Sequence, residues 1–334
     1  MATKIAINGF GRIGRAFFKL AFDNKDLEVV AINDTNDNAT LAHLLKYDTV
    51  YGKFDHDITT NDKEIIVDGI KYNSYAEKDP TKLPWEELGV DIVLESTGKF
   101  RTEEEATEHI KAGAKRVVIS APAKGGDVQT VVFGVNYDEK DDHKVISNAS
   151  CTTNCIAPVM SIMSGKFGIQ KAAMTTIHSY TADQNLVDGS HSDLRRARSG
   201  AENIIPTTTG AAKATAITIP VLEGVFDGIA IRVPTPVVSL SDITMLLKKK
   251  TTVEEINKTF IEAKDTPRYE GVLDVTDEPL VSSDFIGNTY ASIVDLSLTK
   301  VIDGDLAKII TWYDNEWGYS SALIKVCYET GKKL

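Results

Sequence analysis

Short apolar runs alternate with helical spacing of apolar residues along the first half of the chain. The runs, rich in valine and isoleucine, lie at Lys4–Ile7, Leu27–Ile32, Asp91–Leu94, Arg116–Ile119 and Thr130–Phe133. Between the third and fourth runs, Thr102 and Glu105 form a capping box at the start of a helix that Gly113 ends. Because strands alternate with helices, we predict an α/β domain built on a doubly wound parallel sheet.

The second half carries longer runs with period-two alternation. These runs lie at Ala230–Val233, Val237–Lys248, Ala291–Val301 and Leu306–Tyr313. Asp303-Gly304 lies between the last two and predicts a hairpin turn. Helices are predicted over Val253–Ala263, after an N-cap at Thr252, and over Ser320–Glu329. We therefore expect an α+β second domain with a mainly antiparallel sheet. The predicted domains are 1–149, joined by the C-terminal helix 316–334, and 150–315.

Composition narrows the class of protein. At 334 residues the chain exceeds the size of a single hydrophobic core. A net charge of −11 argues against binding to nucleic acid or to an anionic membrane surface, although arginines can still make a cleft attract small anions. The start lacks the pattern of a signal peptide, and no apolar run approaches the roughly 18 residues of a membrane span. Three cysteines suit a reducing compartment, so we expect a cytoplasmic protein.

The sequence Gly9-Phe-Gly11-Arg-Ile-Gly14 follows the first predicted strand and opens a helix. Asp34 lies twenty residues beyond Gly14, at the end of the next strand. This context predicts a Rossmann dinucleotide site, in which the glycines admit a pyrophosphate to the helix N-terminus. Asp34 would bind the ribose hydroxyls and repel a 2′-phosphate, which favours NAD. The alternative is a glycine-rich turn followed by a solvent-facing aspartate.

Two of the three cysteines lie in "ISNASCTTNCIAP", at positions 151 and 155. A metal site needs more ligands than the one remaining cysteine supplies, so no metal is expected, and a reducing compartment disfavours a disulfide. Cys155 has apolar neighbours and is predicted to pack in the core. Cys151 has polar neighbours, and a helix beginning near Ser150 would favour its ionisation near neutral pH. Pro158 argues against a long straight helix here.

A cysteine nucleophile requires a base, and the chain has six histidines. His178 ends the β-prone run "AAMTTIHS", where a strand would deliver it to the edge of a sheet. It is the candidate base, although a strand-end histidine held only by hydrogen bonds is an equally simple explanation. His191, in a polar loop, is a weaker rival. The remaining histidines are expected at the surface, namely His43, His56, His109 and His143.

Seven motifs together resemble the bacterial-type phosphorylating glyceraldehyde-3-phosphate dehydrogenases. They are "INGFGRIGR", "SNASCTTNCIAP", "TTIHSYTADQ", "DLRRAR", "IIPTTTGAAKA", "RVPTP" and "WYDNEWGYS". They occur in the family's order over nearly the whole chain. The resemblance implies a glycolytic oxidoreductase that converts D-glyceraldehyde 3-phosphate, phosphate and NAD into 1,3-bisphosphoglycerate. It implies that Cys151 forms the thiohemiacetal and thioester, and that His178 is the base.

The resemblance also assigns binding residues. Thr181 and Arg232 would hold the substrate phosphate. The attacking inorganic phosphate would be held by Ser150, Thr152, Arg196, Thr209 and Gly210. Beside the glycines and Asp34, the implied cofactor contacts are Arg12, Ile13, Lys78, Ser120 and Asn315. Without the family, "DLRRAR" is more simply a solvated helix face, "TTTG" a loop, Ser120 a strand end and Asn315 a turn residue.

The chain departs from strictly NAD-dependent members at two positions. Thr35 replaces a leucine and Ser190 a proline, and hydroxyls there resemble the chloroplast members that accept NADP. We therefore predict NAD as the preferred cofactor with secondary use of NADP. The family also implies a homotetramer. Two alternatives are an erythrose-4-phosphate dehydrogenase and an additional role as an NAD-binding partner or surface adhesin.

Overall fold

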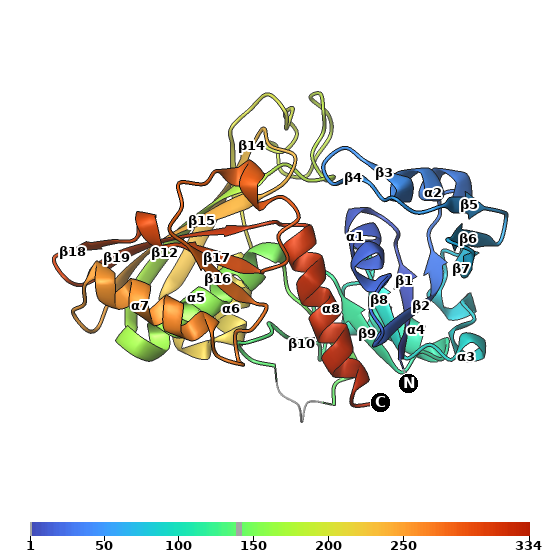
Figure 1. The fold of residues 1–334 in the computed structure, drawn as a ribbon, viewed down its shortest axis with the longest axis horizontal. Coiled ribbons are helices and arrows are strands. Elements are labelled where there is room, and N and C mark those ends of the chain that lie inside the picture. The colour runs from blue at the N-terminus through green and yellow to red at the C-terminus, as the bar shows by residue number, and fades with distance from the viewer. Residues whose placement is uncertain (1, 138–141) are drawn as a thin grey trace. The chain divides into compact units, whose positions relative to one another are not determined.

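The computed structural model describes residues 2–137 and 142–334, which form two compact units (Figure 1). The first unit comprises Met1–Val131, Tyr137–Ala149 and Leu323–Leu334. The second comprises Val132–Asn136 and Ser150–Ala322. No helix among the described residues is long and apolar enough to cross a membrane.

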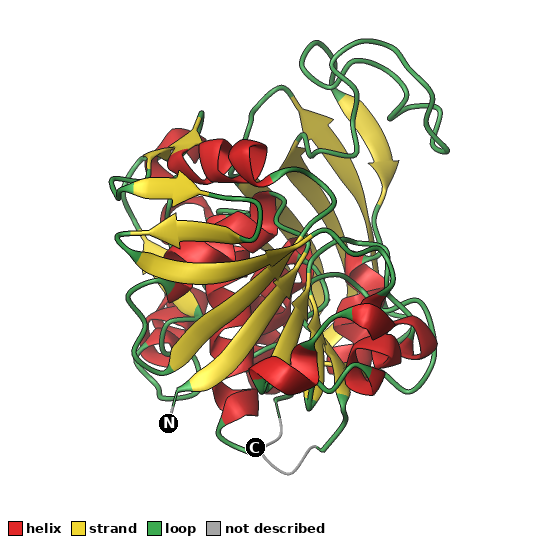
Figure 2. Cartoon of the chain, turned by 90° about the vertical axis from the view of Figure 1, so that its right-hand side faces the viewer, coloured by secondary structure: helices red, strands yellow, loops and turns green. Residues whose placement is uncertain are grey.

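The first unit is built on a sheet whose central strands are parallel, which confirms the predicted class. The described strands follow the order β10-β11-β9-β8-β1-β2-β7-β6-β5. Their bounds are β1 Thr3–Asn8, β2 Leu27–Asn33, β5 Ile58–Thr60, β6 Glu64–Val67, β7 Ile70–Tyr75, β8 Ile92–Glu95, β9 Arg116–Ile119, β10 Gln129–Thr130 and β11 Val145–Ser147. Figure 2 shows the parallel strands side by side in a twisted fan. Because they are parallel, their carboxyl ends meet at one edge, where such sheets bind ligands.

Helices and a small ribbon complete the first unit. The helices are α1 Arg12–Ala21, α2 Asn38–Lys46, α3 Trp85–Leu88 and α4 Glu103–Lys111, and the ribbon pairs β3 Tyr47–Asp48 with β4 Gly52–Lys53. The predicted capping box starts α4, where Thr102 accepts from the Glu105 backbone and the Glu105 carboxylate accepts from Thr102 N–H. Trp85, Val93 and Val117 are buried in the core of this unit.

The second unit contains a mainly antiparallel sheet, as predicted. Its described strands follow the order β13-β14-β12-β15-β19-β17-β16, with β18 paired to β19. Their bounds are β12 Ile169–Ser179, β13 Ile205–Thr208, β14 Phe226–Val233, β15 Ser239–Leu247, β16 Leu273–Thr276, β17 Ser292–Asp295, β18 Lys300–Ile302 and β19 Leu306–Tyr313. The helices are α5 Cys151–Phe167, α6 Ala211–Thr218 and α7 Val253–Lys264. The final helix, α8 Trp317–Gly331, has residues in both units.

Local sequence signals set several of these boundaries. Asp303 and Gly304 both adopt positive φ, of 47° and 79°, so the β18–β19 hairpin turns where predicted. Thr252 accepts from Glu255 N–H and caps α7. The core of this unit gathers around α5 and includes Met160, Ile243 and Phe260.

Two predicted strands are shorter than expected. The predicted strand at Thr130–Phe133 ends at Thr130, because the Asn136 side-chain oxygen accepts from Val132 N–H at 2.8 Å. That N–H is then not available to pair with a neighbouring strand. The run at Ala291–Val301 breaks at Leu296–Leu298, a 3₁₀ turn capped by the Asp295 carboxylate. The other described 3₁₀ turns are Pro80–Lys82, Pro220–Leu222 and Ser282–Phe285.

Candidate active site

Cys151 is the first residue of α5, in the second unit. Ser150 is the N-cap, and its hydroxyl accepts from Thr153 N–H at 3.2 Å. Cys155 lies one turn on, is fully buried and contacts the Thr311 hydroxyl at 3.6 Å, which confirms its predicted packing. The helix continues through Pro158 to Phe167, so the proline does not make it short.

His178 is the penultimate residue of β12 and faces Cys151. The distance from Cys151 Sγ to His178 Nε2 is 3.5 Å. His178 Nδ1 lies 2.7 Å from the Ser179 carbonyl oxygen, which can only accept, so the ring proton is on Nδ1. Nε2 therefore presents a lone pair to the sulfur. This geometry lets the imidazole take the proton of the thiol as the sulfur attacks.

The surroundings of the pair favour its uncharged forms. Burial, and secondly the charge of Arg232, lowers the pKa of His178 to about 3. Burial raises the pKa of the Cys151 thiol, while Arg232 and hydrogen bonds from Thr152 act in the opposite direction. The prediction that Cys151 is ionised near neutral pH is therefore wrong in direction. Proton transfer to His178 Nε2 would form the thiolate as the sulfur attacks.

The rival histidine takes part in other contacts. His191 Nδ1 accepts from Asp193 N–H at 2.8 Å, and its Nε2 lies 3.8 Å from an Asp183 oxygen. No described contact joins His191 to Cys151. His178 is thus the histidine that the structure pairs with the sulfur.

Two arginines predicted to bind anions converge on one short segment. Arg232 donates to the Thr181 hydroxyl at 2.8 Å and to the Ser179 carbonyl at 3.1 Å. Thr181 in turn donates to the Asp183 carboxylate, which also accepts from Arg196 at 3.0 Å. Although burial raises it, the pKa of Asp183 is held below its usual range by Thr181 and both arginines. The Asp183 carboxylate therefore accepts from side chains that are also suited to bind an anionic ligand.

The other predicted anion-binding residues lie at two helix starts. Thr152 is near the start of α5, but its hydroxyl bonds the Tyr313 hydroxyl at 2.9 Å. Thr209 and Gly210 precede α6, and the Thr209 hydroxyl accepts from Ala211 N–H. Arg196 lies beside the preceding strand because it donates to the Thr207 hydroxyl and the Thr208 carbonyl, both at 3.0 Å.

A pocket of about 330 Å³ lies at the carboxyl ends of the parallel strands of the first unit. Its lining comprises Asn8, Gly9, Gly11, Asn33, Asp34, Thr35, Asn36, Glu77, Lys78, Pro80, Ser96, Thr97, Lys99 and Phe100. No side chain caps α1 and its first turn has no acidic residue, which leaves the helix start suited to an anion. Gly9 has a φ of +97°, and a Cβ there would lie 2.6 Å from Thr97 N. Gly14 packs so that a Cβ would lie 2.2 Å from the Gly9 carbonyl oxygen.

The predicted cofactor residues separate into two groups. Asp34 lines the pocket and is held rigidly, since its oxygens accept from Phe10 N–H at 2.8 Å and Asn36 N–H at 3.0 Å. The pocket lining omits Arg12, Ile13 and Ser120. Arg12 instead bonds Asp48 at 2.7 Å, and Ser120 N–H donates to the Glu95 carbonyl. Asn315 belongs to the second unit, where its amide oxygen accepts from Ser239 at 3.0 Å.

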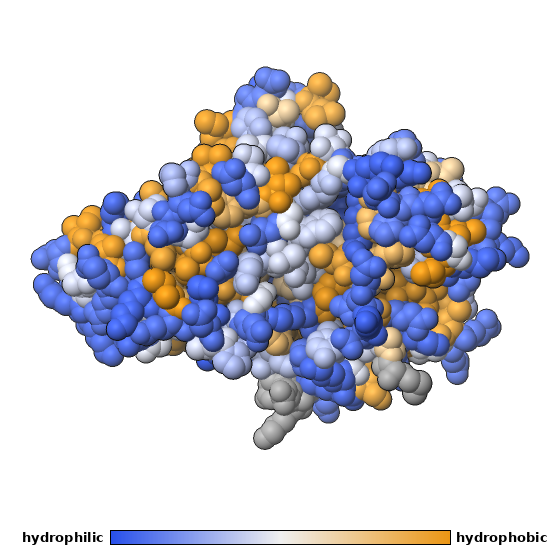
Figure 3. Space-filling model, in the orientation of Figure 1, coloured by the Kyte–Doolittle hydropathy of each residue, from blue (hydrophilic) through white to orange (hydrophobic). Residues whose placement is uncertain are grey.

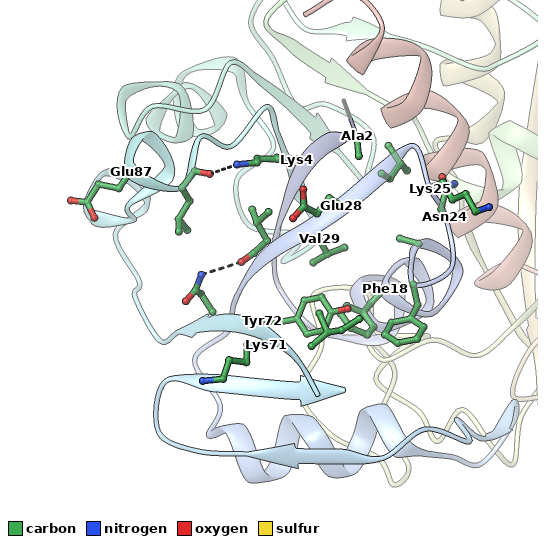
Figure 4. Close-up of a pocket in the computed structure, with 17 residues that line it drawn as sticks. Ala2, Lys4, Phe18, Asn24, Lys25, Glu28, Val29, Lys71, Tyr72 and Glu87 are labelled. Carbon is green, nitrogen blue, oxygen red and sulfur yellow. Dashed lines mark hydrogen bonds between the residues drawn. The ribbon is translucent and has the colours of Figure 1, made fainter. Parts of the chain in front are cut away.

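A wider cavity of about 660 Å³ opens on the first unit near the amino ends of β1 and β2 (Figure 4). Phe18 and Tyr72 pack edge to face in its wall, and Lys4 donates to the Leu88 carbonyl across one side. Ligands of doubly wound sheets bind at the carboxyl ends of the strands, so this cavity is at the wrong end for a dinucleotide.

Several pocket residues were not predicted from the sequence. Asn8 and Asn33 each end a parallel strand with the same letters, "AIN", and this repetition was an available signal. Asp183 gave no such signal. His109 was expected at the surface and is fully buried, because it shares the inner face of α4 with Ala106 three residues earlier.

Among residues 2–137 and 142–334, no three histidine, cysteine or acidic side chains are grouped as metal ligands. Comparison with known families gives two matches. The model described as the NAD binding domain of glyceraldehyde 3-phosphate dehydrogenase matches residues 3–103, and that of the C-terminal domain matches residues 150–315.

Curated relatives match over nearly the full length. The chain is 53% identical to the glyceraldehyde-3-phosphate dehydrogenase of Geobacillus stearothermophilus, covering 97% of both proteins. It is 50% identical to glyceraldehyde-3-phosphate dehydrogenase 1 of Bacillus cereus, covering 99% of this chain and 100% of that one. It is 52% identical to glyceraldehyde-3-phosphate dehydrogenase 2 of Synechocystis sp., covering 96% of both.

Proposed function

The chain belongs to the glyceraldehyde-3-phosphate dehydrogenase family, and we propose that it oxidises and phosphorylates D-glyceraldehyde 3-phosphate in glycolysis, with NAD. The observation that carries this proposal is the 3.5 Å approach of Cys151 Sγ to His178 Nε2, with the ring proton fixed on Nδ1. An aldehyde can be attacked by sulfur only as the thiol proton leaves, and Nε2 is the acceptor for that proton.

The first half-reaction forms a thioester on Cys151. As a bond forms between Sγ and the aldehyde carbon, the thiol proton passes to His178 Nε2 and then to the carbonyl oxygen, which gives a thiohemiacetal. When bound, NAD would supply the acceptor for the hydride that leaves this carbon. His178 takes back the hydroxyl proton as the carbonyl re-forms, leaving an acyl thioester. Because burial keeps the pKa of His178 low, the protonated ring readily gives its proton to the carbonyl oxygen and, later, to the departing sulfur.

The second half-reaction transfers the acyl group to phosphate. An oxygen of inorganic phosphate attacks the thioester carbon, the C–S bond breaks, and the departing sulfur is reprotonated from His178. We assign the substrate phosphate to Thr181 and Arg232, and the attacking phosphate to Ser150, Thr152, Arg196, Thr209 and Gly210. Guanidinium, hydroxyl and backbone N–H groups are the donors that phosphate prefers. Asp183 must leave Arg196 and Thr181 when an anion binds there.

The pocket of the first unit fits a dinucleotide. Gly9 and Gly11 leave the backbone accessible beside an uncapped helix start, which suits a pyrophosphate. Asp34 presents a fixed carboxylate for ribose hydroxyls, and Lys78 lies in the same lining. Arg12, Ile13, Ser120 and Asn315 remain assigned to the cofactor by family resemblance.

An assay that follows NADH formation tests the proposal. With D-glyceraldehyde 3-phosphate and NAD, we expect turnover that requires inorganic phosphate. His178→Asn should lower kcat by about 10²- to 10⁴-fold, the usual contribution of a general base. His56→Asn is a matched control, because His56 bonds Asp68 at the surface. Turnover that proceeds without phosphate, or that prefers erythrose 4-phosphate, would favour the alternative enzyme. The relatives described above are all named glyceraldehyde-3-phosphate dehydrogenases.

We also propose that the protein forms a homotetramer in the cytoplasm. The segment after β12 exposes large apolar side chains, with Leu186, Val187 and Leu194 each at least 75% exposed. Figure 3 shows apolar surface on this projecting loop. Such surface is costly in a monomer and suits contact with another copy. The cysteines Cys151, Cys155 and Cys327 are all free thiols, as a reducing compartment requires. Analytical ultracentrifugation tests the assembly, and a monomer at micromolar concentration would contradict it.

A further inference from the structure

A buried polar network joins three parallel strands directly beneath the cofactor pocket. Its centre is Glu95, the last residue of β8, whose side chain has no exposed surface. A buried carboxylate that is not engaged by donors is unstable, so its partners indicate what it holds in place. The catalytic steps above use none of these groups.

Each oxygen of Glu95 accepts from a residue of the pocket lining. Oε2 accepts from Asn8 Nδ2 at 2.5 Å, at the end of β1. Oε1 accepts from Thr97 N–H at 2.8 Å and from the Thr97 hydroxyl. Asn8 also connects β1 to β2, because its amide oxygen accepts from Asn33 Nδ2 at 2.7 Å. One carboxylate thus joins the carboxyl ends of three strands.

His109 and Trp85 fix the carboxylate from behind. Both are fully buried. Trp85 Nε1–H can only donate, and it meets His109 Nδ1 at 3.1 Å, so the ring proton lies on Nε2. That Nε2–H points at Glu95 Oε2 at 3.2 Å. The edge of the ring also meets Phe100, another residue of the pocket lining, with centroids 6.0 Å apart.

The glycine loop rests on the residues that this network holds. Ser96 donates to the carbonyls of Asn8 and Gly9 at 3.1 and 2.6 Å. Gly9 is so close to Thr97 that any Cβ would collide with the Thr97 backbone. A shift of Thr97 or Asn8 would therefore displace the backbone that receives the pyrophosphate.

We propose that Glu95, held by His109 and Trp85, is a positioning residue that sets the affinity of the glycine loop for NAD. It touches neither the substrate nor the reacting atoms. Its effect belongs to cofactor binding, while the chemical step on Cys151 is independent of it. The inference rests on the proposed placement of NAD in the pocket of the first unit.

Glu95→Gln is the decisive variant. The side-chain amide of glutamine accepts at its oxygen but donates at its nitrogen. Either the donors of Thr97 or those of Asn8 and His109 would therefore face an N–H group in place of an acceptor. We expect the Kd for NAD, measured by calorimetry, to rise about ten- to hundred-fold. At saturating NAD, kcat and the KM for the aldehyde should stay within about threefold of the wild type, since the second unit is unchanged.

A reciprocal exchange separates positioning from mere stability. Asn8→Asp alone places two carboxylates 2.5 Å apart and should weaken NAD binding at least as much. In the double variant with Glu95→Gln, a carboxylate at position 8 again faces an amide at position 95. We expect most of the affinity for NAD to return. The matched control is Asp295→Asn in the second unit, a buried carboxylate that accepts from Trp312 Nε1 and Ser297 N–H. It should lower Tm without changing the Kd for NAD.

The outcomes are distinguishable. Wild-type protein that fails to bind NAD would overturn the proposed cofactor pocket itself. Wild-type binding with an unchanged Kd in folded Glu95→Gln, or a double variant no better than its parents, would overturn the positioning role. If Glu95→Gln does not fold, Trp85→Phe decides, because it removes only the donor that fixes His109. We expect a loss of about two- to fivefold in affinity for NAD, and an unchanged Kd would reject the proposal.

Discussion

The two candidate sites differ in what holds their polar groups. In the first unit, the pocket is formed by backbone, glycines and strand ends, and a buried network fixes them. In the second unit, side chains from a helix start, a strand end and a loop meet around Cys151, and several bond one another, as Asp183 does with Arg196. The first arrangement is prepared to receive a ligand, whereas the second must exchange internal partners for ligand partners.

Because different units hold the two sites, cofactor binding and the chemical step can be perturbed separately. A change at the sulfur should leave NAD affinity intact, and a change beneath the glycine loop should leave the chemistry intact.

Cys151→Ser should abolish dehydrogenase turnover. A hydroxyl is a far weaker nucleophile than a thiol, so we expect kcat to fall by at least about 10⁴-fold. NAD should bind with a Kd within about twofold of the wild type, as calorimetry can measure. Cys155→Ser is the control and should act mainly on stability, because Cys155 is packed in the core. Residual turnover above about one per cent would contradict the assigned nucleophile.

His178 should make the second unit sensitive to acid. Its pKa is lowered to about 3 in the folded protein, whereas an unfolded histidine titrates near 6.5. The unfolded chain therefore binds the proton first, so this stability is complete above pH 6.5 and is lost as the pH falls toward 3.

His178→Asn removes that dependence. Between pH 7 and pH 5 we expect the wild type to lose about 2 kcal/mol more unfolding free energy than the variant, as urea titrations at both pH values would measure. His143→Asn, at a partly exposed histidine, should follow the wild type. Equal losses in wild type and His178→Asn would show that the histidine is protonated in the folded state.

The sequence predicted the fold well where a local pattern determines the element. The capping box at Thr102 and the turn at Asp303 involve neighbours in sequence, so their chemistry is visible in the letters. Prediction failed where a distant or unpatterned side chain competes for the backbone. Asn136 ends a strand by taking Val132 N–H, and no periodicity reveals that bond.

The candidate site followed the same rule. Gly9 and Gly11 belong to one short motif, Asp34 follows it at the spacing that the motif requires, and the three residues do share a pocket. That Cys151 and His178 are close depends on how β12 packs beside α5, which a single sequence does not specify. The predicted direction of the pKa shift of Cys151 was wrong, because the sequence shows that the residue starts a helix but does not show that it is buried.

Arg232→Gln tests the electrostatics around the sulfur. Arg232 lowers the pKa of Cys151, so its removal should raise that pKa further. We expect the rate of alkylation by iodoacetamide at pH 8 to fall about three- to tenfold. In the wild type the rate should rise steadily with pH up to about 9, because the thiolate fraction grows toward a raised pKa. Arg198→Gln is the control, since Arg198 pairs with Asp188 at the surface. A wild-type plateau below pH 7 would indicate a thiolate already formed.

Thr35→Leu should produce the smallest effect, on the choice between cofactors. Thr35 lines the pocket beside Asp34, so a 2′-phosphate there would meet both a hydroxyl donor and a carboxylate. Since the carboxylate is held by Phe10 N–H, it cannot turn away, and repulsion keeps NAD preferred. Removing the hydroxyl should lower kcat/KM for NADP about three- to tenfold and change that for NAD less than twofold.

Ser190→Pro, in the second unit, is the companion variant and isolates the other hydroxyl. If the wild type already prefers NAD by more than about ten-thousand-fold, nearly 6 kcal/mol, neither hydroxyl has a role in cofactor choice. If Thr35→Leu weakens NAD and NADP equally, the hydroxyl supports the pocket rather than the 2′ position. Selectivity would then be set by Asp34 alone, within the part of the molecule whose geometry is fixed before any ligand binds.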